Sequence, residues 1–150
     1  MTMTTPTIRQ HLDNGRVYLL LSDPAWPEFC DAALCYAAAE CEVSTVQTLI
    51  AHGANPVYEQ DGPLYKAADN NNIDVVRYLL TLDDVRKHAS AHKNRSLLAA
   101  QTNECHEIED ALMAIPEVAQ GPSIHKPYYG FTSTHTKEDY ESDIELEELQ

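Results

Sequence analysis

Leucine and alanine recur along this chain with a period of 30 to 33 residues. Leu34, Leu64 and Leu97 stand 30 and 33 residues apart, and each lies three residues before an alanine. A second self-match places the segment 78–85, YLLTLDDV, over the segment 111–118, ALMAIPEV, at an offset of 33. Self-similarity at such a period is typical of a protein built from stacked structural repeats.

Within one period the apolar pattern predicts a short helix, a turn and a second helix. The paired alanines Ala37-Ala38 and Ala67-Ala68 in the first helix allow two neighbouring units to approach closely. Valine and leucine at i, i+3 and i+4 spacing give the second helix one apolar face. Polar residues at 40–42 and 69–72 fall between the two helices, where a turn belongs. Neither helix can bury its apolar face alone, so adjacent units must stack into a solenoid.

The repeating unit resembles the ankyrin repeat. The matching positions are Pro63, Leu64, Ala67, Ala68, Val75, Val76, Leu79 and Leu80, with Gly53, Ala54 and Asn55 closing the preceding unit. The chain departs from the family pattern where Tyr65 and Cys35 replace the motif histidine. The resemblance implies an all-α, ankyrin-like solenoid of about three helix-turn-helix repeats. It also implies a non-catalytic protein–protein interaction module that uses no cofactor.

The expected organisation is an N-terminal capping segment at 1–24, repeats at 25–118, and a linker with a flexible acidic tail at 119–150. Residues 18–20 precede the apolar residues 48–50 by 30 positions and predict the second helix of a cap. In that interpretation Thr5 is the N-cap and Pro6 the first residue of the preceding helix. The alternative is a β-hairpin that turns at Asn14-Gly15. Prolines at 24 and 27 predict a linker before the first full unit.

The charge balance excludes some partners. Ten Lys and Arg residues against 24 Asp and Glu residues give a formal net charge of −14. Neutralising nucleic-acid phosphates or anionic membranes requires a basic surface, so we expect neither partner. The longest apolar run, 32–39, is too short for a membrane span, which takes roughly 20 residues. With no recognisable leader at the N-terminus, we expect a soluble, cytosolic monomer that binds another protein.

The ankyrin resemblance also indicates candidate partner-binding residues. In that pattern Tyr36, Lys66 and Asp69 occupy first-helix positions that face the concave groove, and Glu40, Asn70 and Asn103 lie on the turn side. An exposed tyrosine on a rigid wall suits recognition, since tyrosine is enriched among residues that dominate binding energy. The alternative is that Tyr36 only covers the alanines beneath it.

A local basic segment contrasts with the acidic chain. Residues 86–95 contain four of the ten basic residues, namely Arg86, Lys87, Lys93 and Arg95. The repeat register places this segment in the finger loop between the last two units. It is therefore either a binding patch for an acidic group or a solvated turn with scattered charges.

Two alternatives to a binding module come from other functional classes. The excess of acids suits a nucleic-acid mimic that inhibits an enzyme with a basic cleft. A cysteine-dependent hydrolase would use Cys105 or Cys41, but no known catalytic motif surrounds either residue. The spacing of Cys30, Cys35 and Cys41 does not match that of zinc ligands, so we expect no metal. Four cysteines at this low density favour a reducing compartment.

The C-terminal segment carries a second resemblance. Residues 137–150 contain seven acids and one lysine, a composition typical of a disordered or partner-folded tail. Compact repeats followed by Glu141, Glu145, Glu147 and Glu148 resemble the small ankyrin-type effectors of intracellular bacterial pathogens. That resemblance implies type IV secretion into the host cytosol and a role in virulence. The effector would bind a host protein through its concave face and finger loops.

Overall fold

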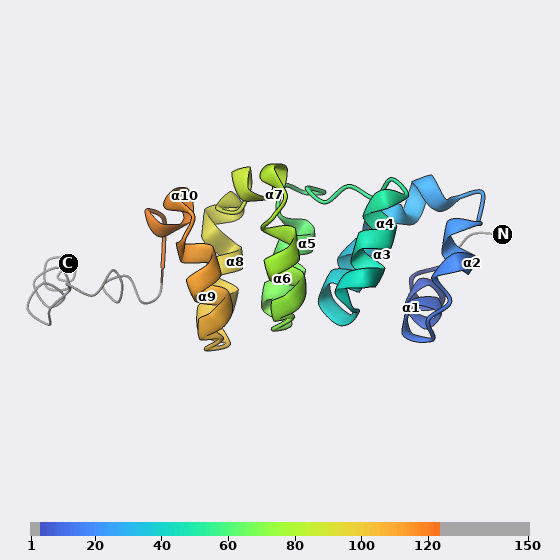
Figure 1. The fold of residues 1–150 in the computed structure, drawn as a ribbon, viewed down its shortest axis with the longest axis horizontal. Coiled ribbons are helices and arrows are strands. Elements are labelled where there is room, and N and C mark those ends of the chain that lie inside the picture. Colours follow the sequence, from blue (N-terminus) through green and yellow to red (C-terminus); the bar gives the residue numbers. More distant parts are fainter. Residues whose placement is uncertain (1–3, 124–150) are drawn as a thin grey trace, which may run out of the picture.

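The computed structural model describes residues 4–123, in which helices are joined by short turns. The helices are α1 (Thr5–Asp13), α2 (Val17–Leu21), α3 (Trp26–Glu40), α4 (Val43–Ala51), α5 (Gly62–Asp69), α6 (Ile73–Leu79), α7 (Asp83–Lys87), α8 (Ala91–Thr102), α9 (His106–Met113) and α10 (Pro116–Ala119). Within 4–123 there is no strand, and Figure 1 shows the helices arranged in one elongated row. The prediction of an all-α, ankyrin-like solenoid is confirmed.

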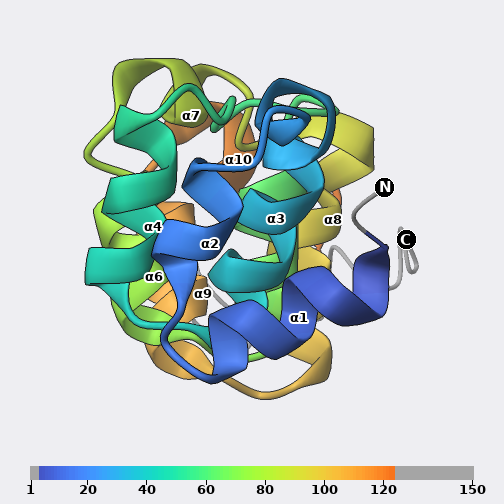
Figure 2. The same cartoon turned by 90° about the vertical axis from the view of Figure 1, so that its right-hand side faces the viewer.

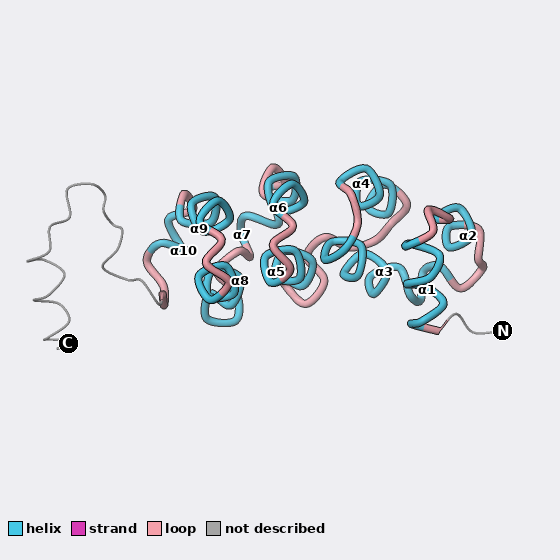
Figure 3. Tube along the Cα trace, turned by 90° about the horizontal axis from the view of Figure 1, so that it is seen from below, coloured by secondary structure: helices cyan, strands magenta, loops and turns pink. Residues whose placement is uncertain are grey.

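The helices form two layers. Helices α1, α3, α5 and α8 lie in one layer and α2, α4, α6 and α9 in the other, as the view from below shows (Figure 3). The extensive contacts run within a pair, such as α3 with α4, or between adjacent pairs, such as α3 with α5 and α4 with α6. The end-on view places α1 and α2 at the N-terminal end of the row (Figure 2). Each pair therefore buries its apolar face against its neighbours.

The repeated leucines and alanines form the core. Leu34, Leu64 and Leu97 have no exposed surface, and neither do the alanines Ala37, Ala67 and Ala100. Because alanine has only a methyl side chain, α3, α5 and α8 can pack closely side by side. Leu49 and Leu79 fill the space between the two layers and are also fully buried. The leucines and alanines that recur in the sequence are therefore the residues that form the core of each helix pair.

The N-terminal segment is helical, so the β-hairpin alternative is wrong. Helix α1 begins one residue earlier than expected, because the N-cap is Thr4, whose hydroxyl accepts a 3.3 Å hydrogen bond from the amide of Thr7. Asn14 and Gly15 form the turn between α1 and α2, and Gly15 has a φ of +73°. A helical hairpin therefore uses the turn residues that also suit a strand hairpin.

The expected linker near Trp26 is also part of a helix. Trp26 and Pro27 open α3, where proline is tolerated because the first-turn amides have no helical partner. The indole nitrogen of Trp26 donates a 2.8 Å hydrogen bond to the carbonyl oxygen of His52, beside the end of α4. Trp26 and Phe29 pack edge to face, with ring centroids 5.5 Å apart. This contact fixes the start of α3 against the end of α4.

The basic segment 86–95 is not a finger loop. Arg86 and Lys87 belong to the short helix α7, which is anchored by the buried Val85. Arg95 lies on α8, after three residues, His92, Lys93 and Asn94, in the left-handed backbone conformation. The valine of α7 recurs 33 residues later as Val118 in α10, so a single helical turn occupies both positions. The acidic tail at 137–150 and most of the predicted segment 119–150 lie outside the described residues.

Candidate functional site

A groove between α1, α3 and α5 brings together four of the residues predicted to bind a partner. Tyr36 and Glu40 come from α3, and Lys66 and Asn70 come from α5 and its C-terminal end. The groove has a volume of about 470 Å³. Its other lining residues are Thr5 and Arg9 of α1, Ala32, Cys35 and Ala39 of α3, and Tyr58 and Glu59 of the loop before α5.

Tyr36 lies between a cation and a carboxylate from α1. Its hydroxyl donates a 2.8 Å hydrogen bond to Oδ1 of Asp13, and the guanidinium of Arg9 lies 5.1 Å from the centre of its ring. Desolvation, followed by the hydrogen bond to Asp13, raises the pKa of the Tyr36 hydroxyl. The ring is held in one position and is half-buried. Tyr36 therefore does more than cover the alanines beneath it, because it also ties α3 to α1.

The floor of the groove is apolar. Ala32, Cys35 and Ala39 follow one another at helical spacing along α3. Burial, followed by the charge of Glu59, raises the pKa of the Cys35 thiol to about 11. At neutral pH Cys35 is thus a neutral, weakly polar surface. A small apolar floor with charged walls suits an extended segment of a partner protein.

The charged walls of the groove contain groups of both signs. Within residues 4–123, no hydrogen bond or ion pair engages the side chains of Lys66, Glu40 and Glu59. Arg9 interacts with the ring of Tyr36 but with no carboxylate within ion-pair distance. These charges stay solvated and can pair with a ligand, because few internal contacts must be broken first.

Asp69, which was predicted to face the groove, and the turn-side residue Asn103 both lie apart from the groove and connect two units. The side-chain amide of Asn103 donates a 2.9 Å hydrogen bond to the backbone carbonyl of Asp69. Glu40 and Asn70 line both the groove and a more polar hollow of about 750 Å³ on the turn side. Of the six predicted residues on α3, α5 and α8, the structure therefore places four together and two in a contact between units.

The four residues of the basic segment do not form one patch. Arg86 pairs with Asp83 and donates a 2.7 Å hydrogen bond to the carbonyl of Leu80. Arg86 and Lys87 line one hollow, between α7 and α10, which neither Lys93 nor Arg95 lines. Lys93 is exposed, whereas Arg95 is directed into the protein. The basic segment 86–95 therefore does not form one common binding patch for an acidic group.

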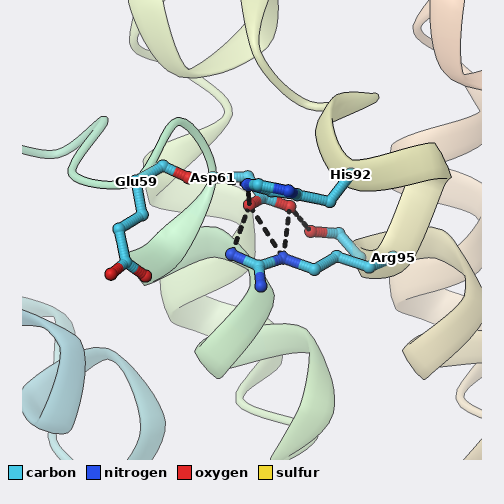
Figure 4. A network of polar contacts seen from close by, with 5 residues as sticks. Glu59, Asp61, His92 and Arg95 are labelled. Carbon is cyan, nitrogen blue, oxygen red and sulfur yellow. Dashed lines mark hydrogen bonds and ion pairs between the residues drawn. The ribbon is translucent and has the colours of Figure 1, made fainter.

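Arg95 instead belongs to a part-buried network around the buried Asp61, which the sequence did not reveal. Its Nε and one terminal nitrogen donate hydrogen bonds of 2.9 and 2.7 Å to Oδ1 of Asp61, a residue only 1% exposed (Figure 4). Ser96 donates a further hydrogen bond to Oδ2 of Asp61, and the guanidinium lies 4.4 Å from the centre of the Tyr65 ring. The hydrogen bonds to Asp61 raise the pKa of the Arg95 guanidinium.

His92 joins this network to the edge of the groove. Its Nε2 donates a 3.1 Å hydrogen bond to the carbonyl oxygen of Glu59 and lies 3.8 Å from Oδ1 of Asp61. Glu59 and Gln60 have φ angles of 54° and 71°, in the left-handed region that side chains disfavour. The network therefore holds a strained loop in place beside the groove, so that Tyr58 and Glu59 line it.

Cys41 does not have the environment of a thiol nucleophile, and the described residues form no metal cluster. Burial, followed by the charge of Asp13, raises the pKa of the Cys41 thiol to about 11, whereas a nucleophilic cysteine needs a lowered pKa. Cys105 is the N-cap residue of α9 and is half-buried. In the part of the chain from 4 to 123, no group of three or more His, Cys, Asp or Glu side chains is placed to hold a metal ion.

Stacked helix pairs in two layers, as described for residues 4–123, define an α-solenoid repeat protein. A family model described as Ankyrin repeats (3 copies) matches residues 10–91, more than half of the chain. The chain belongs to the ankyrin-repeat family, whose members are typically non-enzymatic protein–protein interaction modules. The match begins inside the predicted capping segment and ends before α9. No curated protein and no solved structure matches the chain.

The length and apolar character of a helix decide whether it could cross a membrane. None of the helices described between residues 4 and 123 combines the length and the apolar character needed to cross a bilayer.

Proposed function

We propose that this chain is a non-catalytic adaptor that binds a partner protein through the groove between α1, α3 and α5. The observation that carries the proposal is the convergence of Tyr36, Glu40, Lys66 and Asn70 on one apolar-floored groove. The wall is built on packed helices, so little conformational entropy is lost when a partner binds. A binding groove with cations in its walls favours this function over an acidic nucleic-acid mimic.

The experiment compares partners captured from lysate by four forms of the full chain. The parent is tested beside the groove variant Tyr36→Ala/Lys66→Ala and the segment variant Lys87→Ala/Lys93→Ala. Arg16→Ala/Tyr18→Ala on α2 is the matched control, because both residues are exposed and lie outside the groove. We expect only the groove variant to lose a partner. If it keeps every partner while its helical content and melting temperature match the parent, the groove is the wrong site.

We further propose that the protein is a secreted bacterial effector that acts on a host protein in the host cytosol. The support is the resemblance described above, with Glu141, Glu145, Glu147 and Glu148 as the acidic signal for type IV secretion. A reporter fused to the N-terminus of the full chain tests this in infected cells. We expect delivery by a strain with an intact secretion system and none after these four glutamates are changed to glutamine. Equal delivery by a strain that lacks the system would refute the proposal.

A further inference from the structure

The inner layer of the solenoid already holds two arginines against tyrosine rings. Arg9 of α1 lies over Tyr36 of α3, and Arg95 of α8 lies over Tyr65 of α5. The second pair is completed by the carboxylate of Asp61, which accepts hydrogen bonds from the same guanidinium. At Arg95 this protein thus holds a guanidinium group with an aromatic face and a carboxylate together.

Tyr58 and Glu59 offer the same two groups without an arginine. Tyr58 is 37% exposed, the largest exposure of any aromatic side chain that lines the groove. Figure 4 shows the Glu59 side chain turned away from Asp61 and Arg95. Among the described residues no hydrogen bond, ion pair or cation–π contact engages either side chain. The two residues are nevertheless held at the groove, since His92 bonds to the backbone carbonyl of Glu59.

We propose that Tyr58 and Glu59 bind an arginine side chain of an extended segment of the partner protein. The aliphatic stem of that arginine would lie over the apolar floor at Ala32 and Cys35, with its guanidinium between the Tyr58 ring and the Glu59 carboxylate. This inference rests on the proposed function, because it names the chemistry of the partner in the same groove. The net charge of −14 supports it, since a strongly acidic protein steers basic segments toward itself.

The other charges of the groove assign this arginine to the edge formed by the loop. Lys66 and Arg9 come from α5 and α1 and disfavour a second cation beside them. Glu59, by contrast, stands in the loop before α5 with no cation partner within residues 4–123. The same arrangement accommodates an acidic residue of the partner near Lys66. A preferred partner segment therefore places its arginine at Glu59 and any acidic residue near Lys66, so the spacing between these two residues of the segment is fixed.

The experiment selects peptides from a phage-displayed random dodecapeptide library on the full-length protein. A parallel selection uses Ala32→Arg, which fills the groove from an exposed helix position. Peptides that bind the parent but not Ala32→Arg are synthesised, and their arginine is replaced by citrulline, which keeps the shape and removes the charge. Binding is measured by fluorescence polarisation to the parent, to Glu59→Gln and to Tyr58→Ala. Glu28→Gln and Tyr18→Ala are the matched controls, because both residues are exposed outside the groove.

We expect the groove-dependent peptides to share an arginine. Citrulline should weaken binding to the parent by roughly tenfold or more, and by much less in Glu59→Gln, because the charge partner is already gone. Both control variants should bind like the parent. Groove-dependent peptides without a shared arginine, or an arginine whose effect does not depend on Glu59, would overturn this inference and leave the proposed function standing. A library without any groove-dependent peptide would overturn both.

Discussion

The side-chain amide of Asn72 donates a 2.9 Å hydrogen bond to the backbone carbonyl of Ala38, 34 residues earlier in the chain. A second bond of 3.0 Å reaches the carbonyl of Cys41. Both acceptors lie at the C-terminal end of α3, where carbonyl groups have no partner within the helix. One asparagine therefore closes the end of the preceding inner helix and joins two repeats.

Replacing Asn72 with alanine should lower the free energy of unfolding by about 1–3 kcal/mol, since two part-buried carbonyls lose their donor. Asn72→Asp should be at least as harmful at neutral pH, because a carboxylate then faces two carbonyl oxygens. Chemical denaturation measures both changes. The exposed Gln47→Ala on α4 is the control, and equal stability of all these proteins would contradict the inter-repeat role.

Leu79→Ala tests the stacked core. Leu79 of α6 is fully buried in the core, so its removal leaves a cavity and should cost about 2–5 kcal/mol. Leu19 is the matched control because 36% of its surface is exposed, and Leu19→Ala should change stability much less. Thermal unfolding followed by circular dichroism gives the comparison. A Leu79→Ala protein that melts within a degree or two of the parent would refute the packing described for this helix.

Asp61→Asn tests the network beside the groove. The substitution removes the charge that Arg95 and Ser96 contact and should cost about 1.5–3 kcal/mol. This loss of stability is smaller than that expected for breaking a fully buried ion pair, because the Arg95 side chain is 31% exposed. Hydrogen exchange should also accelerate at Glu59 and Gln60, whose loop the network holds. The exposed Asp84→Asn should change neither quantity, and a loop unaffected by Asp61→Asn would show that His92 alone secures it.

The thiols of Cys35 and Cys41 should react slowly with iodoacetamide. Burial raises both pKa values from the ordinary 9.0 to about 11. At pH 8 the thiolate fraction, and with it the alkylation rate, should be about a hundredfold below that of the same thiols in the unfolded chain. Mass spectrometry of the folded and denatured protein measures the ratio. A rapidly labelled Cys41 would instead revive the cysteine-dependent hydrolase.

The same two thiols make stability depend on alkaline pH. A pKa that rises from 9.0 to about 11 on folding means that the folded chain holds these protons more tightly. Their contribution is therefore complete below pH 9 and is lost as the pH rises from 9 through about 11. Denaturation midpoints at pH 8 and pH 10.5, under reducing conditions, should show a loss of stability that is smaller in Cys35→Ser/Cys41→Ser. An identical loss in that variant would exclude the thiols as its cause.

The sequence predicted those features that repeat. Leu34, Leu64 and Leu97, with the alanines that follow them, place the inner helices, since a buried apolar position must recur once per unit. The same register brought Tyr36 and Lys66 to one face, because side chains at equivalent positions of adjacent inner helices lie side by side. The stacked helices therefore follow from the period, whereas the ankyrin resemblance was needed to place Tyr36 and Lys66 at a groove.

Contacts specific to one pair of units could not be predicted in this way. Asp61 and Arg95 are 34 residues apart, and the positions equivalent to Arg95 in the two preceding units are Ala32 and Gly62, so no periodicity marks this contact. Three left-handed residues precede Arg95, and the repeat pattern does not predict this backbone conformation. Arg9 was missed because α1 repeats the pattern too weakly to show which of its residues faces α3.

The groove draws its walls from α1, α3, α5 and the loop between α4 and α5, while α9 and α10 contribute nothing to it. Since the extensive contacts of each helix pair reach only its immediate neighbours, the pair α8 and α9 supports the groove indirectly, through its contacts with α5 and α6. During evolution the array can thus gain or lose whole pairs beyond α8 and α9 without altering the residues that line the groove. The number of helix pairs and the residues that bind a partner can therefore change independently of each other.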